Sequence, residues 1–578
     1  MGRMPREIYR FCAEVSQLLG CILRNCEQSG IAAVPRTTGR DRPGIFGVQC
    51  RRSKIGFLAA LLLVMACTGC MVLRQVDYVL PALRVDCPPN IPLPGEEDEK
   101  VQDAIATWDD LTDAERDRFP TAYHVYTDSP VPGTFEGELA VGVAFSGGGT
   151  RGQVFGAACY RALERLYLRT SGADGVRDLS ITAETDYIAG VSTGAFPAAL
   201  LALDFGGQCP PDRQTTQWPE ALNVNLQWRL LRRLGLRPWL VARDYLLETN
   251  SRPVSIAVFE NAFFRGPDGQ GLTFGNLPST PVLFLCSSRM GNPSGPFIQT
   301  RLAYRHYLEV PPEAPWAPPV LQTFENTGAD PMRASLAEAC YNSISYPALM
   351  RSGLIRVFED PAWIMAGLDT AERDRMHLAR EGLPPGTLIE LKDGGLIDNR
   401  AVFVIGEIFA NLIREGAVER PPLLISIDAS VLDLQPLGRE LPGRTGWMGE
   451  IAASYLALWQ ATHRANATLM EHHARDGGYH LVRFELAAWI PCLEPVTERE
   501  HFEREYLAAL CAEEPVIGTV ERFVEVMRGM GTSLGALPPE QMAAAQVAAR
   551  FAVWKGMDGL RQWAWACGGD DAVIVERP

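Results

Sequence analysis

Short, continuous apolar runs recur along the middle of the chain, and each is bounded by glycine or polar residues. Runs of this length without polar alternation are typical of strands that are buried on both faces, as in parallel sheets. The pattern predicts strands at Leu139–Phe145, Tyr187–Ala189, Val282–Cys286, Leu388–Leu391, Leu423–Ile427 and Leu481–Leu486.

Apolar residues at helical spacing lie between several of these runs. Residues 153–168 alternate small and apolar residues, and Ala195–Phe205 is a second such stretch, with Pro197 in its first turn, where a missing N–H costs little. Strands alternating with helices predict an α/β fold, a three-layer α/β/α architecture around a mostly parallel central sheet. We interpret residues 208–274 and 311–319 as irregular insertions over the sheet edge.

A different pattern marks the N-terminal part. Ile55–Leu73 is nineteen residues long and uncharged, and Arg51, Arg52 and Lys54 lie just before it. This length is just enough for a helix to span a bilayer, and the basic flank and small residues also fit a signal peptide. We therefore expect residues 1–54 to be a basic N-terminal extension and residues 55–73 to be a signal peptide or membrane anchor.

Two sites within this segment, each a small residue followed by Cys67 or Cys70, resemble a bacterial lipoprotein box. Cleavage with lipidation at either cysteine, or retention as an inner-membrane anchor, both stay open. Either route predicts a protein associated with a membrane of the bacterial cell envelope, with its body on the periplasmic side by the positive-inside rule. The Pro-, Asp- and Glu-rich residues 76–137 are interpreted as a linker with one short helix around Asp110–Arg118.

The composition is that of a globular protein, with 47% hydrophobic and 21% charged residues. The formal net charge of −15 argues against nucleic acid as a partner and against strong electrostatic docking to anionic membranes. Of the 14 cysteines, six lie within or before the apolar segment; the others are far apart and do not form metal-ligand pairs, and we interpret most of the cysteines as small buried hydrophobes. Residues 138–430 contain the strand and helix alternation, and residues 431–578 are expected to be mainly helical.

Candidate chemistry begins with GVSTG at residues 190–194, which follows a predicted strand and precedes a predicted helix. This is the context of a nucleophile elbow, in which Gly190 and Gly194 relieve the crowding of a sharp turn that exposes Ser192. The helix N-terminus below favours developing negative charge. Alone the motif is weak, because a serine in a glycine-bounded turn is common.

Two glycine-rich loops also follow predicted strands. GGGTRG at residues 147–152 lets backbone N–H groups converge on an anion, and we interpret it as an oxyanion hole, since the Lys-Ser/Thr of a phosphate-binding P-loop is absent. DGGLIDN at residues 393–399 holds Asp393 between a strand and Gly394 and Gly395, where its carboxylate can face another side chain. Alone, an Asp-Gly pair is an ordinary turn.

Together, in this order, the loop, the elbow and the Asp-Gly-Gly resemble the patatin-like phospholipase family over roughly residues 138–430. The run SISYPAL at residues 343–349 also looks like a Ser/Ala-rich segment of that family, whereas Ser146 departs from the residue that many members carry before the glycines. The resemblance implies a lipid acyl hydrolase, such as a phospholipase A, a lysophospholipase or an esterase, with residues 138–430 as the catalytic domain and a lipid ester as substrate.

The resemblance also implies roles for the residues. Ser192 is the nucleophile and Asp393 its base, in a dyad that forms an acyl-enzyme without cofactor or metal. The residues of the oxyanion loop are Gly147, Gly148, Gly149, Arg151 and Gly152. Arg151 either orients this loop or meets a lipid phosphate, and bracing of the backbone is the interpretation that we favour.

Two alternatives stay open. A Ser–His–Asp triad is compatible with chain order, although we interpret the histidines as surface residues; those that follow Asp393 are His463, His472, His473, His480 and His501. The second alternative is a membrane-tethered scaffold that binds lipid and has no catalytic activity. The sequence names neither a particular lipid nor a protein partner.

Overall fold

The computed structural model describes the chain from residue 139 onward with gaps. The described ranges are 139–172, 175–235, 252–290, 295–301, 322–324, 327, 334–345, 350, 352–356, 388–414, 416–429 and 466–577. By its contacts the chain divides into the units Met1–Pro81 and Ala82–Pro578, and all described residues belong to the second. The predicted N-terminal extension, apolar segment and linker therefore lie outside the described residues, as does the expected insertion at 311–319.

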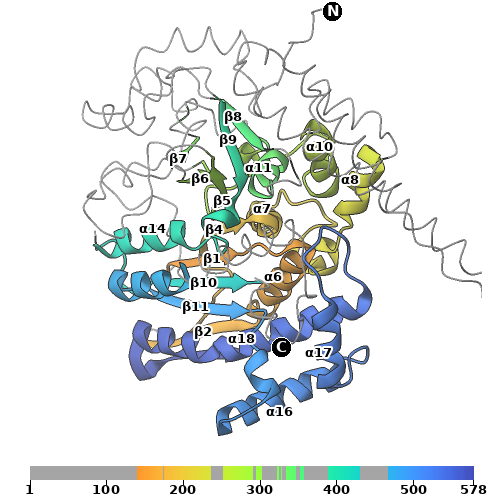
Figure 1. Cartoon of the computed structure of the whole chain (residues 1–578). Coiled ribbons are helices and arrows are strands. Elements are labelled where there is room, and N and C mark those ends of the chain that lie inside the picture. The colour runs from red at the N-terminus through yellow and green to blue at the C-terminus, as the bar shows by residue number, and fades with distance from the viewer. Residues whose placement is uncertain are drawn as a thin grey trace, which may run out of the picture. The chain divides into compact units, whose positions relative to one another are not determined.

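The main sheet carries the strand order β11-β10-β1-β4-β5-β6-β7, with β9 pairing to β5 and β8 pairing to β9. From β11 to β5 all neighbours are parallel, and the antiparallel pairs are at the other end of the sheet. Figure 1 shows this order from β8 and β9 at the top to β11 below. The strands are β1 (Val141–Phe145), β4 (Thr185–Val191), β5 (Val282–Arg289), β6 (Gly295–Gln299), β7 (Gln322–Thr323), β8 (Gly353–Arg356), β9 (Leu388–Asp393), β10 (Leu423–Asp428) and β11 (His480–Glu485).

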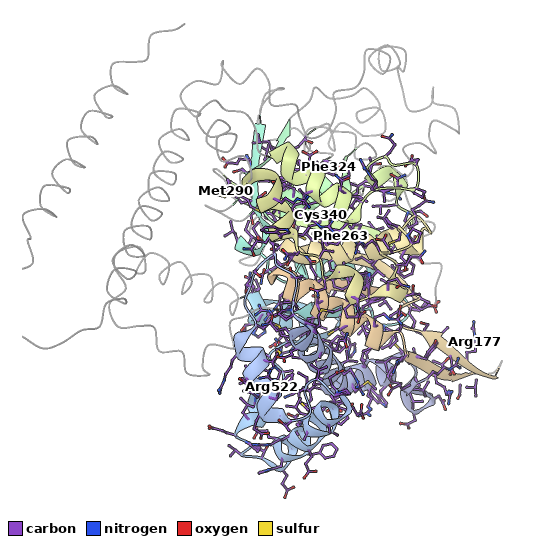
Figure 2. The ribbon with its side chains drawn as sticks, turned by 90° about the vertical axis from the view of Figure 1, so that its right-hand side faces the viewer. Arg177, Phe263, Met290, Phe324, Cys340 and Arg522 are labelled. Atoms are coloured by element: carbon purple, nitrogen blue, oxygen red, sulfur yellow. The ribbon has the colours of Figure 1, made fainter. Side chains whose placement is uncertain are left out.

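A second, antiparallel sheet has the order β12-β2-β3. Strand β2 (Leu166–Gly172) forms a hairpin with β3 (Gly175–Ser180), and Figure 2 shows this hairpin, near whose turn Arg177 lies, projecting from the rest. The C-terminal strand β12 (Ala572–Glu576) pairs with β2, from Ala572 opposite Thr170 to Glu576 opposite Leu166. The end of the chain is thereby joined to the region that directly follows the first helix.

Helices cover both faces of the main sheet. The α-helices are α6 (Gly149–Leu163), α7 (Ala195–Phe205), α8 (Leu226–Gly235), α10 (Arg252–Phe263), α11 (Leu336–Ser343), α14 (Phe403–Arg414), α16 (Glu498–Glu513), α17 (Val520–Gly529) and α18 (Pro539–Gly568). Short 3-10 turns are η3 (Ser192–Gly194), η4 (Thr215–Gln217), η5 (Glu220–Leu222), η6 (Phe274–Asn276), η10 (Gly394–Leu396), η12 (Ile490–Leu493) and η13 (Gly569–Asp571).

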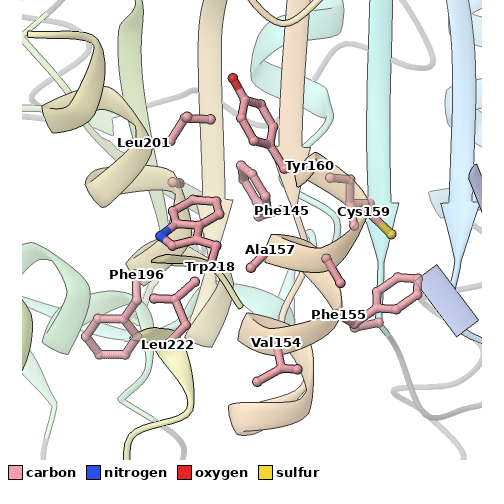
Figure 3. Packing of buried hydrophobic residues seen from close by; sticks show 14 of the residues in the cluster. Phe145, Val154, Phe155, Ala157, Cys159, Tyr160, Phe196, Leu201, Trp218 and Leu222 are labelled. Carbon is pink, nitrogen blue, oxygen red and sulfur yellow. The ribbon is translucent and has the colours of Figure 1, made fainter. Parts of the chain in front are cut away.

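The alternation of side chains along the strands divides the apolar core between the two faces. On β1, Val141, Val143 and Phe145 enter a large cluster with α6, α7, α10, α11 and α18, whereas Ala144 enters a smaller cluster with α14. Figure 3 shows part of the large cluster, where side chains of α6 and α7 pack around Phe145 and Trp218. The predicted α/β class with a mostly parallel sheet covered on both faces is confirmed.

The C-terminal helices pack against the sheet and its first helix. Strand β11 continues the parallel sheet beyond β10, and α18 lies along α6 and β11. Buried Trp563 of α18 donates its indole N–H to the Pro421 carbonyl, 2.9 Å away, just before β10. In Figure 1, α16, α17 and α18 lie below β11. The region from β11 onward therefore shares one core with the first half of the fold.

Each predicted strand coincides with an observed one, and the helix predicted at Ala195–Phe205 is α7. The helix predicted at 153–168 was placed too late: α6 ends at Leu163, and β2 begins at Leu166. Buried Leu166 and Leu168 alternate with partly exposed Tyr167 and Arg169, a strand pattern that also satisfies helical spacing over so few residues.

The expectation that residues 208–274 are irregular was wrong in part. They include α8 and α10, and α10 buries Val258, Phe259 and Phe263 in the large core cluster. Glycines and prolines before and after these helices hid their short apolar faces. Within the described part of the chain, no helix is long and apolar enough to cross a membrane.

Candidate active site

The turn between β4 and α7 holds Ser192 in a strained conformation. Ser192 has φ 52°, the left-handed region that non-glycine residues rarely adopt. A Cβ at Gly190 would lie 2.6 Å from the Gly194 carbonyl oxygen, and a Cβ at Gly194 would lie 2.4 Å from that of Phe145. The two glycines are therefore required by close packing of backbone on backbone, as a nucleophile elbow needs.

The backbone of Ser192 is held by a side chain from another element. Its N–H donates to Ser343 Oγ, 2.9 Å away, at the end of α11. Ser343 in turn donates to the Cys286 carbonyl on β5, 2.6 Å away. The Ser343 side chain, which makes both bonds, is fully buried. This relay fixes the strained elbow to the neighbouring strand.

The carboxylate of Asp393 meets the hydroxyl of Ser192. Asp393 ends β9, and its Oδ2 accepts a hydrogen bond of 2.8 Å from Ser192 Oγ, although the two residues are 201 positions apart. Its other oxygen, Oδ1, accepts from the Gly395 N–H at 2.9 Å. The Asp393 N–H donates to the Ser345 carbonyl, 3.2 Å away. Both residues of the pair are thus anchored on the C-terminal end of α11, Ser192 through Ser343 and Asp393 through Ser345 just after the helix.

Asp393 is buried, with 7% of its surface exposed, and burial raises the pKa of its carboxyl group to about 6. Burial disfavours the charged form, while the hydrogen bonds from Gly395 and Ser192 stabilise it and limit the shift. The carboxyl group is therefore a stronger base than an exposed aspartate, and it is still mostly ionised at neutral pH.

The glycine-rich loop lies against Ser192. A Cβ at Gly147 would lie 2.8 Å from Ser192 Cβ and 2.6 Å from Asn399 Oδ1, so only glycine fits. Gly148 and Gly149 have φ 142° and φ 70°, and Gly149 begins α6. This backbone path brings the N-terminus of the helix beside the hydroxyl group.

Several amide groups of this loop already have acceptors. Gly147 N–H donates to the Asn399 carbonyl at 3.3 Å, Thr150 N–H to that of Ser533 at 2.7 Å, and Gly152 N–H to that of Gly148 at 3.4 Å. The N–H groups of Gly148 and Gly149 donate to no acceptor in the described part of the chain. Of the residues predicted for an oxyanion hole, these two have donors to offer.

Arg151 is directed elsewhere. Its guanidinium group is fully buried and donates to the carbonyls of Ala429 and Met530 and to Thr532 Oγ1, at 3.2–3.3 Å. Burial lowers the pKa of Arg151 to about 10, while Asp428 opposes the shift. These contacts support the bracing interpretation, and a buried side chain cannot meet a lipid phosphate. Gly152 is likewise structural, because its N–H is used within the loop.

The segment that receives Arg151 and Thr150, residues 530–537 between α17 and α18, is here named the C-terminal strap. It lies against the loop so closely that a Cβ at Gly149 would be 2.5 Å from the Ser533 carbonyl oxygen. The strap was not foreseen, because nothing in its sequence indicates a contact made 381 residues away, the separation of Arg151 and Thr532.

Ser343 and Asn399 were also not assigned roles from the sequence. Asn399 ends the DGGLIDN motif, and its side-chain oxygen packs where a Cβ at Gly395 or Gly147 would lie. Ser146 accepts from the Ala429 N–H at 2.7 Å, which ties the glycine loop to the end of β10. The motif itself could have pointed to Asn399, and the SISYPAL run to Ser343.

The histidines of the described residues form no hydrogen bond with Ser192 or Asp393. His473 Nε2 lies 2.9 Å from Glu407 Oε1, and His473 Nδ1 lies 2.9 Å from the hydroxyl of Tyr479, a residue of the smaller core cluster. The expectation that the histidines lie at the surface was wrong for His473, because Tyr479 and α14 enclose it. No cluster of metal-ligating side chains occurs within the described ranges.

The cysteines follow the prediction of small buried hydrophobes. The cysteines that the structure describes form no disulfide. Cys567 is partly buried, and the others are buried: Cys159, Cys209, Cys286, Cys340, Cys492 and Cys511.

Comparison with known protein families matches residues 143–404 to the family described as patatin-like phospholipase. No curated protein matches the chain. The matched stretch runs from β1 into α14, so it includes Ser192 and Asp393 but neither β10 nor the C-terminal strap. At the level of the family, this match supports lipid acyl hydrolase activity.

Proposed function

We propose that this protein hydrolyses carboxylic ester bonds of lipids through a Ser192–Asp393 dyad. The observation that carries the proposal is the 2.8 Å hydrogen bond from Ser192 Oγ to Asp393 Oδ2, beside the N–H groups of Gly148 and Gly149, which have no acceptor among the described residues. The family match of residues 143–404 supports the same class of reaction. The substrate class is a lipid acyl ester.

In the first half of the reaction, Ser192 Oγ attacks the ester carbonyl carbon and its proton passes to Asp393 Oδ2. The carbonyl oxygen becomes an oxyanion, and Gly148 and Gly149 N–H at the N-terminus of α6 stabilise it. Collapse of the tetrahedral intermediate breaks the ester C–O bond, and the leaving alcohol takes the proton from Asp393. An acyl-serine ester remains.

In the second half, water replaces the alcohol. Asp393 accepts a proton from the attacking water, and the same amides stabilise the second oxyanion. Breakage of the acyl-serine bond releases the fatty acid, and Ser192 regains its proton from Asp393. The raised pKa of Asp393 favours both transfers, because the carboxylate that accepts a proton is then a better match for the donor.

A fluorophosphonate probe tests the nucleophile. We expect wild type to be labelled and Ser192→Ala not to be labelled, with lipid hydrolysis lost in parallel. Asp393→Asn is expected to lower kcat by about three orders of magnitude or more, as removal of a catalytic base does. His473→Ala serves as the control, and it should retain both labelling and hydrolysis.

Two other functions give different results in the same experiment. A Ser–His–Asp hydrolase would lose its activity on replacement of one histidine, with His463 outside the described residues the one to include. A lipid-binding scaffold would show no labelling at all. The intact geometry of the dyad favours the enzyme over the scaffold, since binding alone does not require a hydroxyl aimed at a carboxylate.

We further propose that residues 55–73 hold the protein at a membrane of the bacterial cell envelope, with the body on the periplasmic side. The uncharged segment and its basic flank support this proposal. Fractionation of cells that express the full chain tests the location, and metabolic labelling with a fatty-acid analogue tests lipidation. Loss of label in Cys67→Ser or Cys70→Ser would identify the modified cysteine, and recovery of all protein in the soluble fraction would contradict the proposal.

A further inference from the structure

Helix α8 is joined to the candidate active site by the C-terminal strap. The Gln227 N–H, in the first turn of α8, donates to the Leu534 carbonyl at 2.9 Å. Asn223, just before the helix, exchanges two hydrogen bonds with Leu537, of 2.6 and 2.9 Å. The adjacent Ser533 carbonyl accepts from Thr150. Figure 1 shows the loop between α17 and α18 rising beside α8, which therefore lies at the rim of the site.

The outer face of α8 carries a tryptophan and arginines. Leu226 is fully buried and Leu230 is partly buried, so these two side chains fasten the helix to the core. Trp228, by contrast, is 61% exposed, and Arg229 and Arg232 are exposed. At 100° per residue these three side chains fall within one third of the helix circumference. They form a single outward face, which we name the α8 face.

The charge of the α8 face is opposite to that of the molecule as a whole. The helix sequence LQWRLLRRLG contains three arginines and no acidic residue, whereas the chain has a formal net charge of −15. Neither Arg229 nor Arg232 is in an ion pair with any residue that the structure describes. Most exposed arginines of the C-terminal helices do have acidic partners, as Arg550 has in Glu513. Among the described residues, the α8 face is therefore a local positive patch whose arginines have no acidic partner.

We propose that the α8 face docks on an anionic lipid surface and so presents the rim of the active site to its substrate. This inference rests on the proposed function and adds the surface that the enzyme recognises. Tryptophan prefers the boundary between lipid head groups and acyl chains, and arginines attract anionic head groups. The acidic body as a whole argued against electrostatic docking; the α8 face supplies a site at which the local charge is favourable.

Vesicle co-sedimentation of the full chain tests the proposal. Each variant is mixed with vesicles of phosphatidylglycerol and phosphatidylcholine or of phosphatidylcholine alone, and the ratio of the two affinities is measured. This ratio cancels the part of binding that depends on the apolar segment at residues 55–73 and not on charge. Hydrolysis of a soluble short-chain ester is measured on the same samples, because it reports on the dyad without a lipid surface.

Two pairs of matched variants are compared. Arg229→Gln with Arg232→Gln is compared with Arg475→Gln and Arg528→Gln, two exposed arginines elsewhere, so that the net charge changes equally. Trp228→Ala is compared with Trp565→Ala on α18, whose tryptophan is 64% exposed. A basic residue near an anionic surface contributes about 1 kcal/mol to binding. Replacing both Arg229 and Arg232 is therefore expected to reduce the anionic preference about 25-fold, whereas replacing Arg475 and Arg528 should change it little.

The expected result is a loss of anionic preference in the variant with Arg229→Gln and Arg232→Gln, and weaker binding to both kinds of vesicle in Trp228→Ala, with hydrolysis of the soluble ester unchanged in both. The anionic preference of wild type is expected to decline in high salt. Equal vesicle binding by the α8 variants and their controls would overturn the docking proposal and would point to an acidic protein as the partner of this face. Absence of ester hydrolysis in wild type would overturn the proposed function instead, and the binding ratio would still decide the docking.

Discussion

At the scale of single residues, the site depends on the pKa that burial gives to the carboxyl group of Asp393. Asp393 is the proposed base, and its environment removes water but supplies hydrogen bonds from Gly395 and Ser192. The balance leaves its pKa near 6, above that of an exposed aspartate and below neutral pH. The charge of this group therefore changes within an experimentally convenient range.

The activity should follow the ionisation of Asp393. The base must be deprotonated to accept the Ser192 proton, so kcat/KM on a soluble ester is expected to fall about tenfold for each pH unit below about 6, the pKa of Asp393, and to level off above it. A pH–rate profile measures this limb. A midpoint near pH 4 would mean that Asp393 is not buried during the reaction.

The raised pKa of Asp393 should also lower the free energy of unfolding at neutral pH. The folded state holds a proton that the unfolded chain releases between the ordinary pKa of 3.8 and about 6, so the free energy of unfolding of wild type falls as pH rises through this window. Asp393→Asn lacks this dependence. Its stability relative to wild type is expected to grow by up to about 3 kcal/mol from pH 4 to pH 7. Denaturant unfolding at several pH values measures the difference, and a constant difference would contradict the raised pKa.

Ser343 is expected to be a positioning residue, because its hydroxyl holds the strained amide of Ser192. Ser343→Ala should lower kcat and the rate of fluorophosphonate labelling at least tenfold, leave KM nearly unchanged, and cost about 1 kcal/mol of stability. Ser335→Ala is the matched control, because it removes the N-cap of the same helix at a similar cost of about 1 kcal/mol. Equal activity of the two variants would show that Ser343 matters only for folding.

At the scale of elements, the conformation of the glycine-rich loop at residues 147–152 depends on the segments that surround it. The DGGLIDN segment and the C-terminal strap together decide which amides of the loop stay available, because Asn399 accepts from the N–H of Gly147 and Ser533 accepts from that of Thr150. Arg151 fastens the first turn of α6 to the strap and to the end of β10. The geometry of the loop is therefore a property of several elements in contact.

Gly149→Ala tests this contact. The substitution adds a Cβ 2.5 Å from the Ser533 backbone at φ 70°, so either the strap or the loop must move. Ester hydrolysis is expected to fall at least tenfold, together with a loss of about 1–3 kcal/mol of stability from overpacking. The control is Gly207→Ala, at φ 64° with open space around it, which should cost about 1–2 kcal/mol in backbone strain and leave activity unchanged. Full activity in Gly149→Ala would rule out a role for the strap.

At the scale of the whole molecule, the fold extends beyond the stretch that matches the family. Strand β11 completes the parallel part of the sheet, α18 covers α6, and β12 pairs with β2. Trp563 and Leu560 of α18 are fully buried in the same cluster as Val143 and Phe145. The C-terminal region thus contributes core as well as the strap.

A chain truncated after residue 477, which lacks β11 and α16–α18, is expected not to fold cooperatively. The truncation exposes the apolar face of α6 and leaves β10 as an open edge, which promotes aggregation. Thermal unfolding followed by circular dichroism, with soluble-ester hydrolysis, measures the outcome. A monomeric, active truncated protein would show that the C-terminal region is dispensable.

The sequence alone indicated the elements and the order of the motifs, because both are local. The strands at β1, β4, β5, β9, β10 and β11 were visible as apolar runs, and the glycines around Ser192 and Asp393 as turns. Strands β7 and β8, of 2 and 4 residues, were not, since so few residues carry no clear period. Helices α8 and α10 were hidden between glycines and prolines.

Only the tertiary structure decided the properties that arise where distant segments of the chain come into contact. The 2.8 Å contact across 201 residues, the anchoring by Ser343, the strap on Gly149 and the raised pKa of Asp393 all depend on neighbours that are distant in sequence. Local sequence patterns determine which backbone conformations are low in free energy. Burial and hydrogen-bond partners are determined by how distant segments pack. The residue types of the site could therefore be named from the sequence, whereas their environment could be obtained only from the fold.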